Sequence, residues 1–352
     1  MMLATENEAY QNGKGFIHEM TFRKRLTELK KSELSWLKEV GSNVTKRACM
    51  DCQEAFNRFF AHQAGYPKFK SRNKTPLSFY VNYETFKRTC NGFRGERLGN
   101  VKTSEVLPKA DKYMNPHISY DGKYWYVSFA YEIPDCDRKN TSDLVVGIDL
   151  GIKELAVLSN GTVYPNINKS KKVRRLKKKL RRAQRAASRK IENNIESYDE
   201  NRRPHWKRPL RECKNHAKAK KKIKLLYRRL KNIRNNYIHQ IAAALVKATP
   251  KAIVIEDLAV KNMMKNRYLA KSIAEQKWYE FRRILTYKCS MNNIKLHIAS
   301  RFYPSSKTCS GCGYIKKGLK LSERIYKCPE CRLVIDRDLN AAINLSRCEI
   351  PA

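Results

Sequence analysis

Two pairs of cysteines near the end of the chain restrict its fold more than any other feature of the sequence. Two residues separate Cys309 from Cys312 and Cys328 from Cys331, and 15 residues lie between the pairs. This spacing is typical of a zinc ribbon, in which two turns bring four thiolates into a tetrahedron. The intervening residues are mostly polar and basic, so little apolar core is available to fold this segment without metal. The sequence therefore predicts one structural zinc ion bound by these four cysteines.

A further pair with the same spacing, Cys49 and Cys52, has no second pair nearby. Both cysteines fall within a predicted helix, and Cys52 lies on its apolar stripe. We interpret them as core or surface thiols rather than metal ligands. The 11 cysteines of the chain are an odd number, which favours thiol and metal use in a reducing compartment over a disulfide framework.

The chain is strongly basic. Its 352 residues include 74 Lys and Arg against 33 Asp and Glu, a formal net charge of +41, which makes nucleic acid the first partner to consider. Lys and Arg are most frequent over residues 169–234. We interpret this segment as a helical insertion that lines a nucleic-acid channel. The alternative is a helix whose charged face is simply solvated. The candidate phosphate-binding residues are Lys171, Lys172, Arg174, Arg175, Lys177, Lys178, Arg181, Arg182, Arg185 and Arg189.

The first part of the chain has the pattern of a helical piece followed by a small β piece. Apolar residues at helical spacing predict helices over 22–40 and 44–60, and two strands are expected over 77–83 and 124–131. An aromatic group in this region is open to two interpretations, because its rings are suited either to the core of a sheet or to stacking on bases. Its members are Phe69, Phe79, Tyr80, Tyr83 and Phe86.

From residue 143 onward, short apolar runs alternate with helical patterns, which is typical of an α/β sheet domain carrying insertions. Asn160 and Gly161 suit the type I′ turn of a hairpin that leads into residues 162–164. No run approaches the ~18 apolar residues of a membrane span, and no signal-peptide pattern follows Met1. The expected strands are 144–149, 154–159, 252–255 and 294–299, and the expected helices are about 272–289 and 336–347.

Three acids stand at the edges of buried-type elements: Asp149 and Glu256 end apolar runs, and Asp338 opens the last helix. A carboxylate buried at a strand end is costly unless a cation or hydrogen bonds compensate it. Three of them at one sheet edge would repel each other and would attract Mg²⁺, which supports phosphodiester cleavage. Asp257 and Asp336 compete for these roles, although Asp257 would point to the opposite face of its strand and Asp336 is placed to cap the helix.

Several motifs occur together in a recognisable order: Gly147-Ile148-Asp149-Leu150-Gly151, Ile255-Glu256-Asp257-Leu258, Ser305-Ser306-Lys307-Thr308-Cys309 and Asp336-Arg337-Asp338-Leu339-Asn340-Ala341-Ala342. With them the chain strongly resembles the TnpB (OrfB) proteins of insertion sequences, relatives of compact type V CRISPR nucleases. The likeness runs from about Lys30 to Leu345.

The resemblance implies a RuvC-like, RNase H-like α/β domain with a basic helical insertion and a zinc-ribbon insertion, preceded by an N-terminal helical and small β (wedge-like) lobe. The chain opens directly at Ala4–Asn7, where family members usually begin with an extra strand and helix, so we expect a shortened guide-holding lobe. The expected domains are 1–65 (helical), 66–140 (β-rich), 141–300 (RuvC-like, with the basic segment 169–234), 301–335 (zinc ribbon) and 336–352 (last RuvC segment).

The function implied by the resemblance is that of a transposon-encoded, RNA-guided DNA endonuclease. The implied catalytic residues are Asp149, Glu256 and Asp338, which would bind two Mg²⁺ ions. Asp338 is preferred to Asp336 because the family's third acid stands two residues before Asn-Ala-Ala. The implied partners are a guide RNA derived from the element and double- and single-stranded target DNA, with no membrane and no small-molecule substrate. The implied location is the cytoplasm of a prokaryote, at the nucleoid.

Two alternatives belong to other functional classes. A non-catalytic nucleic-acid-binding protein would need the basic surface but not the three acids. The presence of all three acids therefore favours the endonuclease. A transposase in the strict sense would join DNA ends itself, but the sequence has no tyrosine nucleophile flanked by a histidine pair.

Overall fold

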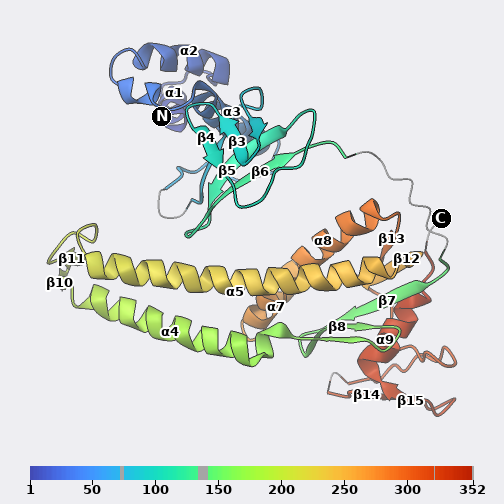
Figure 1. Cartoon of the computed structure of the whole chain (residues 1–352). Helices are drawn as coiled ribbons and strands as arrows, with labels where there is room; N and C mark the ends of the chain where they lie inside the picture. The colour runs from blue at the N-terminus through green and yellow to red at the C-terminus, as the bar shows by residue number, and fades with distance from the viewer. Residues whose placement is uncertain (72–74, 134–141, 321, 351–352) are drawn as a thin grey trace. The chain divides into compact units, whose positions relative to one another are not determined.

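The computed structural model describes residues 1–71, 75–133, 142–320 and 322–350 and divides into two compact units, Met1–Asp135 and Cys136–Ala352 (Figure 1). The predicted domain boundary at residue 140 lies outside the described residues. In the part that the structure describes, no helix is long and apolar enough to cross a membrane.

The first unit begins with helices around a small apolar cluster that includes Phe22 and Leu26. The predicted single helix over 22–40 is wrong: α2 ends at Leu29, and a turn brings Leu34 and Leu37 back against the same cluster. The helix over 44–60 is confirmed as α3. The bounds are α1 Met2–Gln11, α2 Glu19–Leu29, η1 Ser35–Lys38 (a 3₁₀ helix) and α3 Ser42–Phe60.

Cys49 and Cys52 lie on α3 facing this cluster. Cys49 is buried and Cys52 is half-buried, and burial raises the pKa of both thiols. A buried thiol that stays protonated is a poor metal ligand, so the structure supports their interpretation as helix-core thiols.

Two three-stranded antiparallel sheets complete the first unit, with strand orders β1-β5-β6 and β2-β3-β4. Phe86 is buried in their core and Phe79 packs against it, so these two aromatics are core residues. Tyr83 and Phe69 are exposed, at 40% and 64%, so the sheet-core interpretation does not hold for them. The bounds are β1 Leu77–Tyr80, β2 Lys87–Thr89, β3 Gly92–Gly95, β4 Gly99–Lys102, β5 Met114–Tyr120 and β6 Trp125–Ala130.

The second unit is built on a five-stranded sheet of order β13-β12-β7-β8-β9. β7, β8 and β9 form an antiparallel meander, whereas β12 and β13 run parallel to β7. The predicted α/β sheet is thus confirmed. Asn160 and Gly161 lie in the turn between β8 and β9, but the predicted type I′ geometry is wrong, because Gly161 has a positive φ of 83° and Asn160 does not. The bounds are β7 Val145–Leu150, β8 Glu154–Leu158, β9 Val163–Pro165, β12 Ala252–Glu256 and β13 Lys295–Ala299.

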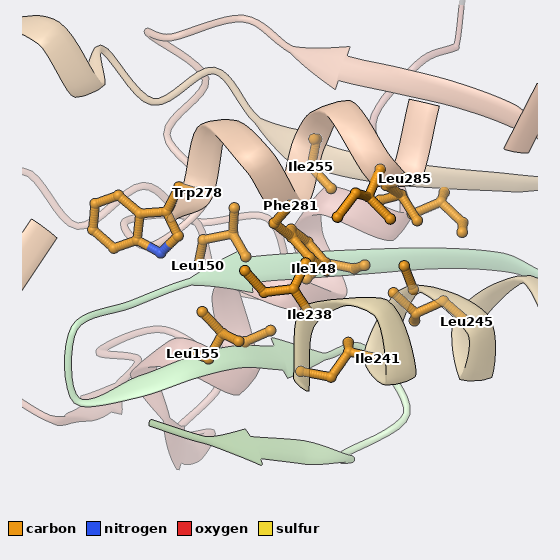
Figure 2. Packing of buried hydrophobic residues seen from close by; sticks show 14 of the residues in the cluster. Ile148, Leu150, Leu155, Ile238, Ile241, Leu245, Ile255, Trp278, Phe281 and Leu285 are labelled. Atoms are coloured by element: carbon orange, nitrogen blue, oxygen red, sulfur yellow. The ribbon is translucent and has the colours of Figure 1, made fainter. Parts of the chain in front are cut away.

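Side chains alternate between the two faces of this sheet, and a different set of helices covers each face. Ile148 and Ile255 point to the face covered by α5 and α8, where they meet Phe281 and Ile238 in the largest core of the protein (Figure 2). Val254 points to the opposite face and packs near Leu345 of α9 (Arg337–Ser346). The alternation therefore directs Asp149 and Glu256 toward the α9 face.

The predicted single helix over 272–289 is wrong, because Lys277 adopts the left-handed conformation (φ 57°) and separates α7 from α8. The buried side chain of Gln276, just before the break, donates hydrogen bonds to the carbonyls of Gly151 and Ile152, both at 3.1 Å. The bounds are α6 Val260–Met263, α7 Ala270–Gln276 and α8 Trp278–Met291.

The basic stretch is not one continuous helix. It forms α4 (Lys171–Glu192) and the start of α5 (Lys214–Lys247), joined through a hairpin of β10 (Ile195–Tyr198) and β11 (Pro204–Trp206). Prolines 204 and 209 in the connection explain why a helix does not continue there. The two helices lie side by side (Figure 1), and a seam of Val173, Leu176, Leu180 and Leu230 packs between them.

Gly147 of β7 allows α9 to lie directly on the sheet. A Cβ atom at this position would stand 2.0 Å from the Ala342 carbonyl oxygen and 2.4 Å from the Ser346 backbone nitrogen. Both are backbone atoms, so no side-chain rearrangement can relieve the clash. This glycine is required by the close approach of a helix and not by its backbone angles.

We expect Gly147→Ala to push α9 off the sheet and destabilise it by about 1–3 kcal/mol, the usual cost of an overpacked core. The measurement is amide hydrogen exchange of α9, which should become faster. Gly318→Ala is the control, since no atom lies within 4 Å of a Cβ at that position. Unchanged exchange in α9 of the Gly147 variant would contradict the packing described.

Candidate active site and metal centre

The three predicted acids converge at one edge of the sheet. β12 pairs with β7 in parallel, with Ile255 beside Ile148, so Glu256 lies next to Asp149 at the carboxyl ends of both strands. Asp338 stands in the first turn of α9, which packs on β7. The alternation of the strands and the close approach at Gly147 thus bring together residues that are nearly 200 positions apart in the chain.

Burial and mutual repulsion set the electrostatics of this carboxylate site. Burial raises the pKa of Asp149 well above its usual value, and the neighbouring charges of Glu256 and Asp338 raise it further. Burial likewise raises the pKa of Glu256, against the opposing effect of a hydrogen bond from Ser305. The only cationic side chain paired with Asp338 among the described residues is Arg337, at 3.7 Å. A divalent cation would relieve the repulsion, so the donor set fits a hard, oxygen-preferring ion.

The two competing acids have other partners. Asp336 caps α9, where its side chain accepts hydrogen bonds from the backbone N–H groups of Asp338 at 2.9 Å and Leu339 at 3.2 Å. Asp257 forms ion pairs with Arg282 at 3.2 Å and Arg301 at 2.7 Å. The capping role expected for Asp336 is confirmed.

Ser305 is a functional residue to which the sequence analysis assigned no role. It is buried in the segment that leads to the ribbon, and its hydroxyl donates to Glu256 Oε1 at 2.8 Å. The hydrogen bond fixes the orientation of one carboxylate of the site. Ser305 stands in one of the motifs that carry the family resemblance, but that motif does not reveal its partner, which lies 49 residues away.

Two buried amides of α9 hold the segment that carries Ser305. Asn344 donates to the carbonyls of Ser305 and Thr308, each at 2.7 Å. Asn340 donates to the Thr308 carbonyl at 2.7 Å and accepts from the backbone N–H of Ser310 at 2.9 Å. The helix that carries Asp338 and the loop that enters the cysteine cluster are therefore one hydrogen-bonded assembly.

The four predicted zinc ligands meet in space. Their sulfur atoms all lie within 4.8 Å of one another, with 3.5 Å between Cys309 and Cys331 and between Cys312 and Cys328. A tetrahedral ion with Zn–S bonds of 2.3 Å would separate sulfurs by about 3.8 Å, so the arrangement is compatible with zinc. Among the described residues no other group of three or more potential ligands is this compact, the three carboxylates included.

A short hairpin supports the cysteine cluster. β14 (Ile325–Lys327) pairs with β15 (Val334–Asp336), and the ring of Tyr326 is fully buried beneath it. The Tyr326 hydroxyl donates to the carbonyls of Lys307 at 3.1 Å and Tyr314 at 3.3 Å. Apart from this residue the ribbon has a small core, as expected of a metal-dependent fold.

Nine of the ten candidate phosphate-binding residues on α4 are exposed, and their opposite face packs on α5. Lys177 differs from the rest: it is half-buried and paired with Glu275, which also binds Arg234 at 3.2 Å. The structure thus places Lys177 in an ion-pair network that ties α4 to α5 and α7.

Comparison with known proteins gives matches over most of the chain. The family model described as "Probable transposase" (OrfB_IS605) matches residues 128–267, and "Cas12f1-like, TNB domain" matches 278–345. A Streptomyces pristinaespiralis protein with the name RNA-guided DNA endonuclease is 34% identical over 91% of this chain and 75% of its own. The RNA-guided DNA endonuclease InsQ of Escherichia coli K12 is 29% identical over 97% of this chain and 83% of its own.

A solved structure shares the fold. The Cas12f1 chain from a cryo-EM structure of a Cas12f1–sgRNA–target DNA complex superposes with a TM-score of 0.52 at 14% identity, covering 98% of this chain and 81% of that chain. The likeness supports a Cas12-like RuvC fold, in agreement with the mixed α/β sheet. Together with the relative that is 34% identical, the matches show that the chain belongs to the TnpB (OrfB) family.

Proposed function

We propose that the chain is a transposon-encoded, RNA-guided DNA endonuclease whose cutting site is formed by Asp149, Glu256 and Asp338. The observation that carries the proposal is the gathering of these three acids at one sheet edge in a chain of net charge +41. Relatives that are similar over nearly the whole chain have names that state the same activity.

The three carboxylates are the residues that would hold Mg²⁺, which when bound activates water and stabilises the leaving oxygen in phosphodiester hydrolysis. The chain's own contribution is orientation. Ser305 fixes Glu256, the Asp336 cap fixes the first turn of α9 and with it Asp338, and Gly147 sets the distance of that helix from β7.

Phosphate binding by the exposed basic residues of α4 is the second part of the proposal. Such contacts are sequence-independent, so the choice of target would come from base pairing with a guide RNA made from the element. The five domains expected from the sequence are part of the same proposal, with α4 and α5 as the insertion and residues 301–335 as the ribbon. A DNA substrate also favours an association with the nucleoid.

Asp149→Asn should lower Mg²⁺-dependent cleavage at least ~100-fold, since even outer partners of metal ligands typically contribute 10–100-fold. Affinity for the guide and the DNA should stay within about twofold of wild type, because the basic surface is unchanged. Cleavage and filter binding measured on one guide-loaded preparation check both points.

The matched control is Asp143→Asn, an acid whose side chain is 96% exposed and which lies outside the carboxylate site. Its cleavage rate should equal that of wild type. Full cleavage by the Asp149 variant would refute the assignment of the site.

We expect one zinc ion per chain in wild type, none after Cys331→Ser, and one after Asn344→Leu. Both variants should lose about 10–100-fold in cleavage, the first because the ribbon unfolds and the second because Ser305 and Thr308 lose their anchor. Elemental analysis and cleavage assays of the same samples distinguish the two causes. Asn236→Leu, at an exposed position of α5, serves as the control and should change neither value.

Replacing Arg181, Arg182 and Arg185 by Gln should weaken binding to all DNA sequences alike. Each lost phosphate contact lowers the slope of log K against log[salt] by about 0.9, so the triple variant should lose up to about 2.7. The charge-preserving triple Lys variant is the control and should keep the wild-type slope. An equal slope in the Gln variant would favour the solvated-face interpretation of α4.

A further inference from the structure

A cavity of about 570 Å³ opens beside the carboxylate site, at the carboxyl edge of the sheet and on its α8 side. Its wall is apolar where Leu150, Leu258 and Trp278 contribute, and Glu256 is also among the lining residues. Its size falls within the range of pockets that hold small organic groups, roughly 300–1,000 Å³. Apart from Glu256, the residues that line the cavity have no role in the proposed cutting chemistry.

An aromatic pair marks one side of this cavity. Trp278 lies at the edge of the main core beside Leu150 (Figure 2) and is only 4% exposed. Its indole N–H has no hydrogen-bond partner within the described residues, which is unusual for a buried donor. Tyr279 follows directly, lines the same cavity and is 73% exposed. A flat ligand with polar edges would fit against Trp278 and Tyr279, because it could stack on a ring and accept from the indole N–H.

The lining of the cavity also carries positive charge held in a fixed arrangement. Asp257 pairs with Arg282 through Oδ1 and with Arg301 through Oδ2, at 3.2 and 2.7 Å. Each guanidinium has five N–H donors, so both keep donors free for a further ligand. Lys261 and Lys265 add two more cations to the lining. Charge complementarity therefore favours an anionic group, and a guanidinium fork favours phosphate.

We propose that this cavity holds one nucleotide of the DNA strand that is being cut. The base lies against Trp278 and Tyr279, and its phosphate binds Arg282 and Arg301, for which Asp257 is the positioning residue. The inference rests on the proposed function and deepens it. A strand whose scissile phosphate lies at Glu256 passes this edge of the sheet, so the neighbouring nucleotide is the group within reach.

The test uses guide-loaded protein with Ca²⁺ in place of Mg²⁺ and single-stranded DNA in which the fluorescent base 2-aminopurine occupies one position at a time. Stacking on aromatic rings should quench the fluorescence at one position only. Arg282→Ala should weaken binding of that DNA roughly tenfold, as expected for the loss of a charged phosphate contact.

Arg283→Ala is the matched control, because Arg283 is the next residue of α8 but pairs with Glu280 at 2.8 Å and does not line the cavity. Its affinity should equal that of wild type. Asp257→Asn should raise KM for DNA more than it lowers kcat, since the fork is loosened while the carboxylate site remains.

Equal quenching at all positions, no quenching, or equal affinities of the Arg282 and Arg283 variants would overturn the proposal. A guided-cleavage assay with Mg²⁺ on the same preparation tests the proposed function separately from the nucleotide site. Cleavage without position-specific quenching would leave the proposed function standing and remove the nucleotide site. Position-specific quenching without cleavage would remove the proposed function and, with it, the assignment of the bound nucleotide to a strand that is cut.

Discussion

The arrangement of the second unit depends on two buried amide side chains. Asn340 and Asn344 are 0% and 4% exposed, and a buried amide is costly unless its donors and acceptor are paired. Their partners are backbone groups at residues 305, 308 and 310, so the pairing leaves the loop little freedom. The same helix carries Asp338 in its first turn and rests on β7. The cysteine cluster and the carboxylate site therefore share one support, so a change in the structure of either one should alter the other.

Charge is distributed unevenly over this unit. Carboxylates gather at one sheet edge, where burial and mutual repulsion raise the pKa of Asp149 and Glu256, while the cations cover α4 and the cavity by α8. Few of the cations are used to neutralise the carboxylates. Asp257 is the contrast, because the hydrogen bond from Arg301 and the nearby guanidinium charges hold its pKa below the usual value. Asp257, although it is adjacent to Glu256, therefore pairs with Arg282 and Arg301 and not with the carboxylate site.

The sequence was sufficient where the relevant information is local. The cysteine spacing predicted that the four cysteines would gather, and apolar runs ending in an acid predicted β7 and β12. The sequence was insufficient where tertiary contacts determine the local structure. The breaks after Leu29 and at Lys277 serve packing against distant residues, and short strands such as β2 to β4 carry too few residues for a pattern. The role of Ser305 could not be predicted, because only the folded chain brings it to Glu256. Asn340 and Asn344 did leave a signal, since they are two amides four residues apart among buried apolar neighbours on α9.

The length of α4 has a consequence of its own. With 22 residues at 1.5 Å each, the helix is about 33 Å long, and its exposed face carries cations at every turn. One turn of a B-form duplex advances about 34–36 Å. The exposed cationic face of α4 is therefore about as long as one turn of a B-form duplex, and removing a single heptad would shorten it by about 10 Å.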